Sequence, residues 1–527
     1  MRDYFVIYVN GRQVRVDGVD AFLSLAEFLR SKLRLTGCKV VCNEGDCGAC
    51  TVLVGKPVAD GRLEYRPVDA CIVFVYQLDC RHVVTIEGVS PTGMRSHDPH
   101  SRADETVALG ALQRGFVEEH ASQCGFCTPG FVMAALGTGE ITPSIGRCDV
   151  STEGCVDAAQ APAGKSPPAE HRNAAEWAEA VSGNLCRCTG YLQILSALTT
   201  WWNRVDSRPD DSLATRYPSA AMCQDFAALE PTSEVCTPEG EGSRRVVVPR
   251  RLDEALRLLH DRQGAQLVAG ATDVGVRANK AGVRPSEIVC LSHIDEMRYV
   301  NVDGEVLRIG AGTTWTETER AVREYFPEFA TLLHRFGSPQ IRNLGTVGGN
   351  VANGSPIADS LPFFFAMEST VQVASVGGER TVAISELYRG YKDLALEPGE
   401  MIVELRTPLP GPRDRLQLFK ISRRKDLDIA SFTAAVRLRC DGDRIERAWI
   451  ACGAAGPTVR RAPAAESALS GKAWTHEAFE AAAIAIQDDV APISDVRGSE
   501  AYRRRLAGNV LRKCFYTLDP SRDDPKE

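Results

Sequence analysis

The sequence predicts a multidomain α+β protein, and three observations support this fold class. The chain has 527 residues, whereas one domain typically takes about 100–200 residues. Runs with the β-branched and aromatic composition of strands occur together with runs that have the helical spacing of apolar residues. Two groups of four cysteines, each within a short motif or pair of motifs, lie in the N-terminal part of the chain.

Composition and charge exclude several classes of protein. Hydrophobic residues make up 44% of the chain and charged residues 25%, which is typical of a globular protein. The formal net charge of −8 argues against a surface that binds nucleic acid or anionic membranes. The longest apolar run, Ala70–Tyr76, is too short to span a bilayer.

The cysteine content indicates a reducing compartment. The chain has 18 cysteines, and its first residues, MRDYFVIYVNG, lack the positive-then-apolar pattern of a signal peptide. A cytoplasmic location is therefore expected. In that compartment clustered cysteines are metal ligands more often than disulfides.

The first 88 residues predict a hairpin, a helix and two further strands. Tyr4–Val9 and Gln13–Val16 flank Asn10-Gly11, which is the strongest short hairpin signal. Apolar residues recur at helical spacing over Ala21–Leu35. Strands are expected near Thr51–Val54 and Cys71–Val75.

Four cysteines of this region have the spacing of a plant-type [2Fe–2S] site. A C-x4-C-x2-C motif is followed by a fourth cysteine 21 positions later, which gives the ligands Cys42, Cys47, Cys50 and Cys71. Gly45, Gly48 and Ala49 leave room for a loop that curls around a cluster, and its free amides can face the sulfides. The alternatives, a zinc knuckle and a disulfide framework, are less favoured because zinc sites usually pair two C-x2-C units and a disulfide loop needs no glycines.

A second group of four cysteines lies further along the chain. QCGFCTPG and NLCRCTGY contribute Cys124, Cys127, Cys186 and Cys188. An apolar helical run follows each motif, Phe131–Leu136 in one case and Tyr191–Leu198 in the other. Thr128 is a candidate N-cap before Pro129. Helix N-termini favour anionic thiolates, but C-x2-C with C-x-C also suits zinc, so the spacing alone leaves both metals open.

The motifs CNEGDCGACTV, QCGFCTPG and NLCRCTGY resemble the two-cluster module of the molybdenum hydroxylases, the xanthine dehydrogenase and aldehyde oxidase family. The resemblance implies a β-grasp plant-type ferredoxin domain over residues 1–88 and a four-helix [2Fe–2S] bundle over 89–203, whose cluster faces a molybdenum cofactor. An insertion at about 143–175 departs from the family pattern and, from its composition, is expected to be a surface loop. Residues 204–243, rich in proline, are expected to be an extended linker.

Two glycine-rich segments mark the second half of the chain. VVVPRRLDEALRLLHDR predicts a strand and an amphipathic helix after Arg244. LVAGATDVGV, from Leu267, and NLGTVGGNVANGSPIADSLP, from Asn343, can each bring backbone amides onto a diphosphate. Neither is G-x-G-x-x-G or a P-loop, so a Rossmann or NTPase assignment is not supported, and each segment taken alone could be a tight turn.

Downstream of the cysteine motifs, these segments resemble the FAD domain of the same family. The resemblance implies a PCMH/vanillyl-alcohol-oxidase-type FAD domain over 244–410 and a small α+β flavoprotein domain over 411–520. In the latter, strands Thr433–Leu438 and Ala448–Cys452 are expected before a helix at Glu477–Asp488. Carried over by position, the residues implied to bind FAD are Leu267, Val268, Ala269, Gly270, Ala271, Thr272, Asp273, Val274, Phe336, Thr346, Gly348, Gly349, Asn350, Ser355, Asp359, Ile402 and Lys420.

The family resemblance also implies a function. The chain would be the iron–sulfur and FAD subunit of a xanthine dehydrogenase, with a molybdopterin-binding large subunit as its partner in a heterotetramer or larger assembly. Electrons from hypoxanthine or xanthine oxidation would pass through two [2Fe–2S] clusters and FAD to NAD⁺, without a general acid or base on this chain. The loop Phe419–Phe432, with Ser422–Lys425, would lie where NAD⁺ approaches the flavin. The alternatives are the equivalent subunit of an aldehyde or N-heterocycle hydroxylase, and a stand-alone iron–sulfur flavoprotein diaphorase.

Overall fold

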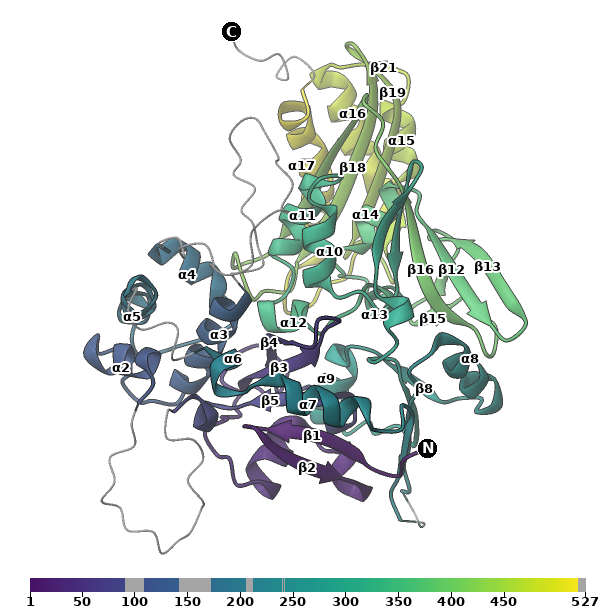
Figure 1. The fold of residues 1–527 in the computed structure, drawn as a ribbon. Coiled ribbons are helices and arrows are strands. Elements are labelled where there is room, and N and C mark those ends of the chain that lie inside the picture. The colour runs from purple at the N-terminus through teal and green to yellow at the C-terminus, as the bar shows by residue number, and fades with distance from the viewer. Residues whose placement is uncertain (91–108, 142–171, 205–211, 239, 241, 520–527) are drawn as a thin grey trace, which may run out of the picture. The chain divides into compact units, whose positions relative to one another are not determined.

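The computed structural model describes residues 1–90, 109–141, 172–204, 212–238, 240 and 242–519, which form two compact units (Figure 1). The first unit consists of Met1–Arg245, Val274–Arg284 and Pro339–Ile341. The second consists of Val246–Asp273, Pro285–Ser338 and Arg342–Glu527. Two short segments from the second half of the sequence thus belong to the unit that holds all the candidate cluster cysteines.

A five-stranded sheet organises the start of the first unit. Its strands are β1 Phe5–Val9, β2 Arg12–Val16, β3 Thr51–Pro57, β4 Leu63–Asp69 and β5 Arg81–Val84. Asn10 and Gly11 have φ of 49° and 79°, and this turn closes the predicted hairpin between β1 and β2. β1 pairs in parallel with β5, which pairs antiparallel with β3, so the order is β2-β1-β5-β3-β4. The predicted β-grasp fold is confirmed.

The helix predicted for Ala21–Leu35 is broken in the structure. A 3-10 turn, the single α turn α1 and a π turn occupy Gly18–Phe22, Leu25–Glu27 and Phe28–Lys32. Ser24 accepts a hydrogen bond from the backbone N of Glu27 and thereby starts a new helical segment inside the predicted one. The apolar residues at helical spacing nevertheless face the core, since Leu25, Phe28 and Leu29 are all buried.

The strand predicted at Cys71–Val75 is wrong. The segment is buried, but Ile72 N donates to Asp69 O in a turn. Leu25 N donates to Val73 O, so the segment's backbone bonds to a helical turn instead of a neighbouring strand. A short apolar run predicts burial, and burial alone does not distinguish a strand from a packed turn.

Four helices form the predicted bundle of the first unit. They are α2 Ala111–Glu118, α3 Thr128–Ile141, α4 Ala174–Ala180 and α5 Leu192–Asn203. α3 begins at Thr128 itself, one position earlier than the N-cap prediction implied, and Cys127 O accepts a hydrogen bond of its first turn. Trp177 of α4 is fully buried and its ring lies 5.8 and 5.7 Å from the rings of Trp201 and Trp202 of α5.

Most of the predicted insertion at 143–175 lies outside the described residues, but its end belongs to the bundle. The side chain of Asn173 caps α4 by accepting hydrogen bonds from two backbone amides at 2.9 and 3.1 Å. The Arg172 guanidinium lies 5.1 Å from the Trp177 ring and 4.8 Å from the Trp202 ring. The predicted insertion therefore overlaps the start of α4, because the chain packs in the helical core from Arg172 onward.

The linker predicted for 204–243 is not simply extended. Its described part contains α6 Leu213–Arg216, α7 Ser219–Ala227 and β6 Ser233–Cys236. Met222 and Phe226, one helical turn apart on α7, pack in a small core with Tyr8 of β1, whose ring lies 5.5 Å from that of Phe226. The prolines favoured an extended chain, whereas burial of this apolar pair stabilises a helix.

The first glycine-rich segment lies among short elements. They are β7 Arg245–Val248, α8 Leu252–Asp261, β8 Gln266–Val268, α9 Thr272–Ala281 and β9 Glu287–Cys290. The strand and helix predicted after Arg244 are present as β7 and α8, and Ala255 and Leu259 form the buried face of α8. β8 pairs in parallel with β9, which places the glycine-rich segment after the carboxyl end of β8.

An antiparallel sheet and several helices form the main core of the second unit. The strands are β10 Val300–Asp303, β11 Val306–Gly310, β12 Thr370–Ser375, β13 Gly378–Ala383 and β16 Met401–Pro408, in the order β10-β11-β16-β12-β13. The helices of this unit between β11 and β12 are α10 Trp315–Val322, α11 Pro327–His334, α13 Val347–Asn353 and α14 Leu361–Ala366, while α12 Pro339–Arg342 lies mostly in the first unit. A short hairpin follows, formed by β14 Tyr388–Gly390 and β15 Asp393–Leu394. Phe329 and Phe363 stack with ring centroids 3.8 Å apart and join α11 to α14.

The C-terminal region is the predicted small α+β domain (Figure 1). Its elements are β17 Asp414–Ile421, β18 Phe432–Asp441, β19 Arg444–Gly453, β20 Arg460–Arg461, α15 Pro463–Leu469, β21 Lys472–Ala473, α16 His476–Asp489 and α17 Glu500–Thr517. The two predicted strands lie inside β18 and β19, and the predicted helix is α16. α17 has 18 residues, yet neither it nor another helix of the described ranges has the length and apolar composition to cross a bilayer.

Candidate redox sites

The four thiols predicted for the first cluster lie together. The Cys42 thiol is in hydrogen-bonding contact with the thiols of Cys47 and Cys71, and that of Cys50 contacts Cys71. Contacts with Cys47 and Cys71 lower the pKa of Cys42, and the backbone N of Asp46 also points at its Sγ, 3.4 Å away. The loop therefore favours a thiolate at Cys42, which is the form that binds iron.

The glycines predicted for this loop have conformations that favour glycine. Gly45 and Gly48 have φ of 75° and 66°, in the left-handed region. A Cβ on Gly48 would also lie 2.3 Å from the backbone O of Gly183, which is too close for any side chain. The curl of the loop around its thiols thus depends on these two positions.

Two residues beside the first group were not predicted. Nδ2 of Asn279, on α9, donates to the backbone O of Cys71 at 2.8 Å and to that of Asn43 at 3.2 Å, so it ties the two cysteine-bearing segments together. Asp69 is fully buried, the Cys50 thiol points at its Oδ1 from 3.6 Å, and burial raises its pKa to about 7. No motif in the sequence marks Asn279 or Asp69, because their contacts with the cysteine segments form only when the chain folds.

The second group of thiols also assembles. The Sγ atoms of Cys124 and Cys188 lie 3.7 Å apart on the exposed side, and the thiols of Cys127 and Cys186 contact each other. Cys127 directly precedes α3. Cys186 and Cys188, from the second motif, lie in the turn before α5. Burial opposes ionisation of Cys186, but hydrogen bonds from Thr189 and from the backbone N of Cys188 outweigh it, so its pKa is lowered.

The thiols of the second group approach one another in two pairs, Cys124–Cys188 and Cys127–Cys186. Across the described ranges of the chain, no group of three or more His, Cys, Asp or Glu side chains is arranged to hold one metal ion. A structural zinc site needs four ligands around one atom, whereas a [2Fe–2S] cluster shares four thiolates between two irons. Four thiols gathered in this way are a donor set that a [2Fe–2S] cluster can take.

The first glycine-rich segment leads from β8 into α9. Leu267 and Val268 end β8, Ala269 to Ala271 form the turn, and Thr272, Asp273 and Val274 begin α9. A Cβ on Gly270 would lie 2.0 Å from Leu344 O and 3.0 Å from Gly345 Cα, and Ala271 has φ of 59°. Glycine at 270 thus permits direct contact between the two glycine-rich segments.

The second glycine-rich segment contains the start of α13. Thr346 caps this helix, since its Oγ1 accepts a hydrogen bond from Gly349 N at 3.1 Å. Gly348 N donates to Ala311 O at 2.9 Å, and a Cβ on Gly348 would lie 2.5 Å from Ala311 Cβ. Ser360 Oγ donates to Oδ1 of Asn350 at 2.6 Å. The backbone of the segment is therefore fixed at several points.

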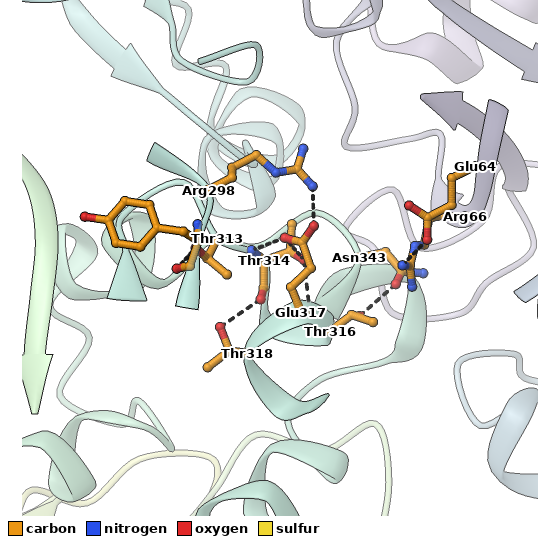
Figure 2. Close-up of polar contacts among 10 residues, drawn as sticks. Glu64, Arg66, Arg298, Thr313, Thr314, Thr316, Glu317, Thr318 and Asn343 are labelled. Carbon is orange, nitrogen blue, oxygen red and sulfur yellow. Dashed lines mark hydrogen bonds and ion pairs between the residues drawn. The ribbon is translucent and has the colours of Figure 1, made fainter. Parts of the chain in front are cut away.

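Figure 2 shows a polar network that holds the neighbouring start of α10. Thr314 and Glu317 form a capping box, and Arg298 donates to Glu317 Oε1 at 2.5 Å. Burial acts to raise the pKa of Glu317, but Arg298 and the cap outweigh it, so the pKa is lowered and the carboxylate stays charged. Thr316 Oγ1 donates to Oδ1 of Asn343 at 2.7 Å, which connects α10 to the start of the second glycine-rich segment.

Asp359 and Lys420 form a buried ion pair. Lys420 Nζ lies 2.8 Å from Asp359 Oδ2 and also donates to the backbone O of Arg335 at 2.7 Å, next to Phe336. Burial raises the pKa of Asp359, and Lys420 only partly opposes this effect. Asp359 Oδ1 is buried without a hydrogen-bond partner in the described part of the chain. A buried, unpaired acceptor is a place where a ligand hydroxyl can donate.

The remaining residues predicted for FAD occupy different surroundings. The Phe336 ring lies 4.9 Å from that of Trp315. Ser355 Oγ accepts a hydrogen bond from Ile357 N at 3.4 Å. Ile402 lies in β16, where it is 7% exposed within the main core of the second unit.

Three family models match most of the chain. Residues 85–199 match a [2Fe-2S] binding domain, residues 240–410 match the FAD binding domain in molybdopterin dehydrogenase, and residues 417–518 match the CO dehydrogenase flavoprotein C-terminal domain. A xanthine dehydrogenase of Drosophila pseudoobscura pseudoobscura is 29% identical over 97% of this chain and 39% of its own length. A xanthine dehydrogenase of Emericella nidulans is 29% identical over 98% of this chain and 39% of its own length.

The chain belongs to the molybdenum hydroxylase family. It spans about 39% of the length of the curated relatives described above. Among solved structures, the carbon monoxide dehydrogenase from Hydrogenophaga pseudoflava is similar at 31% identity, with a TM-score of 0.49, over 50% of this chain and 93% of that one.

One exposed loop of this molybdenum hydroxylase chain carries both signs of charge. It is residues 422–431, between β17 and β18, within the predicted segment Phe419–Phe432, whose two ends belong to these strands. Arg424 N donates to Asp428 Oδ2 at 2.8 Å, and its guanidinium donates to a carbonyl of the same loop, so Arg424 stabilises the turn. The Arg423 guanidinium donates to the backbone O of Val496 at 2.7 Å and remains exposed.

Proposed function

We propose that this chain is the iron–sulfur and FAD electron-transfer component of a xanthine dehydrogenase. It would take electrons from a molybdenum cofactor on a molybdopterin-binding large subunit and deliver them to NAD⁺. One observation carries the proposal: eight thiols gather in two groups of four on a chain that also has two fixed glycine-rich segments in contact. When bound, iron–sulfur clusters carry single electrons and FAD couples them to a two-electron acceptor.

The residues of this chain would hold these groups by charge and shape. The ligands of the first [2Fe–2S] cluster would be Cys42, Cys47, Cys50 and Cys71, and those of the second Cys124, Cys127, Cys186 and Cys188. The two glycine-rich segments would present backbone amides to the FAD diphosphate. Asp359 Oδ1 would accept a hydrogen bond from a ribityl hydroxyl, while Lys420 holds the other carboxylate oxygen.

The substrate would be set by the partner. Its pocket would distinguish hypoxanthine or xanthine from an aldehyde or an N-heterocycle, so the equivalent subunit of such a hydroxylase is the second candidate. The xanthine dehydrogenase relatives, matched over nearly all of this chain, favour the purine substrate. Affinity purification of the chain from its native host tests the choice: a copurifying molybdopterin subunit that oxidises xanthine supports the proposal, and its absence favours a stand-alone diaphorase.

Metal and flavin content tests the cofactor assignment directly. We expect about four iron atoms and one FAD per purified full-length chain, because eight thiols make two four-thiolate sets. Iron, zinc and FAD are measured on the same preparation by mass spectrometry and absorption. About two iron atoms with one zinc would contradict the assignment of the second group, and a chain that retains no FAD would contradict the flavin site.

The exposed charges of the loop Phe419–Phe432 are expected to select NAD⁺ as the acceptor. Arginine can bind phosphate bidentately. Arg423→Ala combined with Arg424→Ala should therefore raise the KM for NAD⁺ about tenfold, which corresponds to the loss of one charge-assisted contact. Reduction of an artificial dye by the same variant should stay nearly unchanged. Arg389→Ala, at an exposed position of β14, is the matched control and should leave both rates alone.

Two results would contradict this expectation. An unchanged KM for NAD⁺ would remove the loop from the nucleotide site. Equal losses with NAD⁺ and with the dye would instead indicate damage to the flavin or clusters. Because the Arg424 guanidinium bonds within the turn and that of Arg423 bonds to Val496 O, Arg423→Ala alone tests phosphate binding with the contacts inside the turn kept.

A further inference from the structure

A backbone hydrogen bond joins the two groups of cysteines. Leu185 N donates to the backbone O of Cys47 at 3.0 Å. Cys47 belongs to the first group, and Leu185 is bonded directly to Cys186 of the second. Both groups lie in the first compact unit, and this bond connects their ligand-bearing segments directly.

Glycines allow three backbone segments to touch at this place. A Cβ on Gly48, in the first cysteine loop, would lie 2.3 Å from Gly183 O, just before Cys186. A Cβ on Gly130, in the first turn of α3 after Cys127, would lie 2.2 Å from Gly48 O. The first cysteine loop therefore lies in close contact with both motifs of the second group. Any side chain at Gly48 or Gly130 would push the loop and the motifs apart.

Asn184 fastens this contact. It is 3% exposed, and its Nδ2 donates to Gly48 O at 2.9 Å and lies 3.4 Å from Thr51 Oγ1. Gln340, fully buried on α12, donates from Nε2 to Asn184 Oδ1 at 3.0 Å and to Thr51 Oγ1 at 3.1 Å. Thr51 Oγ1 in turn donates to Gly48 O at 2.6 Å, which closes the network.

We propose that Asn184 and Gln340 are positioning residues that set the distance and orientation between the two clusters. The inference rests on the proposed cluster ligands, and neither residue touches a cluster itself. A buried network whose members bond to one another holds one arrangement, because each broken bond would leave an unpaired polar group away from water. Gln340 lies 289 residues after Thr51 in the sequence. A network that only stabilised the first cysteine loop would not require a residue from so distant a segment.

Three full-length variants test the proposal. Asn184→Ala removes the bond to Gly48, and Gln340→Met keeps the volume of the side chain but removes both donors. Asn173→Ala is the matched control, since it removes an asparagine that caps α4 on the exposed side of the bundle. The readouts are iron content, the magnetic splitting between the two reduced clusters in electron paramagnetic resonance, and hydrogen exchange of the Leu185 amide.

We expect Asn184→Ala and Gln340→Met to bind as much iron as the unaltered protein. Their magnetic splitting should be smaller or absent, because it falls with the cube of the distance between the two clusters. Exchange of the Leu185 amide should become about fivefold faster or more in Asn184→Ala, as the bond to Cys47 opens. Asn173→Ala should leave the splitting and the exchange rate unchanged.

The outcomes separate this inference from the proposed function. If the unaltered protein shows only one cluster signal, both the function and the inference fail. If it shows two coupled signals and Gln340→Met leaves their splitting unchanged, the function stands and the inference is overturned. Loss of iron in Asn184→Ala with unchanged coupling in Gln340→Met also overturns it, because Asn184 would then only support its own motif.

Discussion

Lys420→Met is expected to destabilise the protein by about 3–5 kcal/mol and to weaken FAD binding about tenfold or more. Lys420 is 4% exposed and pairs at 2.8 Å with Asp359, which is itself almost fully buried. Removal of the lysine leaves a buried carboxyl without its counter-ion, and methionine restores the volume but not the charge. Chemical unfolding of the flavin-free protein and titration with FAD measure the two effects separately.

The loss of stability should depend on pH in a defined direction. Burial already raises the pKa of Asp359 above its ordinary value of 3.8, and loss of Lys420 raises it further. Above pH 3.8 the unfolded chain then releases a proton that the folded variant keeps, so stability falls as pH rises until the raised pKa is passed. The deficit relative to the unaltered protein should therefore be smallest in acid and should grow as pH rises above the pKa that Asp359 has beside Lys420.

The exposed Lys472→Met is the matched control, and it should change neither stability nor FAD affinity. A Lys420→Met protein with the same stability at neutral pH would show that the ion pair is not formed in solution. Reduced stability with unchanged FAD affinity would confirm the ion pair but remove it from the flavin site.

Local patterns predicted much of this fold, and the hairpin shows why. Asn10-Gly11 can adopt positive φ at both positions at little cost, so the turn type is encoded within two residues. The cysteine spacings are equally local, since three ligands of the first group share one loop. The strand predicted at Cys71–Val75 was wrong because an apolar run encodes burial, while its hydrogen-bond partners, such as Leu25, are set by the fold.

The contacts between distant segments could not be predicted. Asn279 and Gln340 look like ordinary helical residues, yet each bonds to backbone or side-chain groups beside the first cysteine loop. Met222 and Phe226 of α7 are buried against residues of distant segments, among them Tyr8 of β1. The prolines of this segment predicted an extended chain. One pair of apolar residues is a weak signal for a helix unless the surface that buries it is known.

Cys124→Ser is expected to remove one cluster and leave the other. Cys124 is exposed and its Sγ lies 3.7 Å from that of Cys188, so the change should alter the packing of the metal-free protein little. Serine oxygen is a poorer, less ionised ligand for iron than thiolate. We expect the iron content to fall from about four atoms to about two per chain.

The spectroscopic result identifies which cluster is lost. Electron paramagnetic resonance of the reduced protein should lose one of two signals, while the signal of the plant-type site formed by Cys42, Cys47, Cys50 and Cys71 persists, because none of those ligands has changed. Cys223→Ser, on α7 and outside both thiol groups, is the matched control and should keep about four iron atoms and both signals. Loss of both signals in Cys124→Ser would mean that the eight thiols do not divide into two independent sites, and retention of both would exclude Cys124 as a ligand.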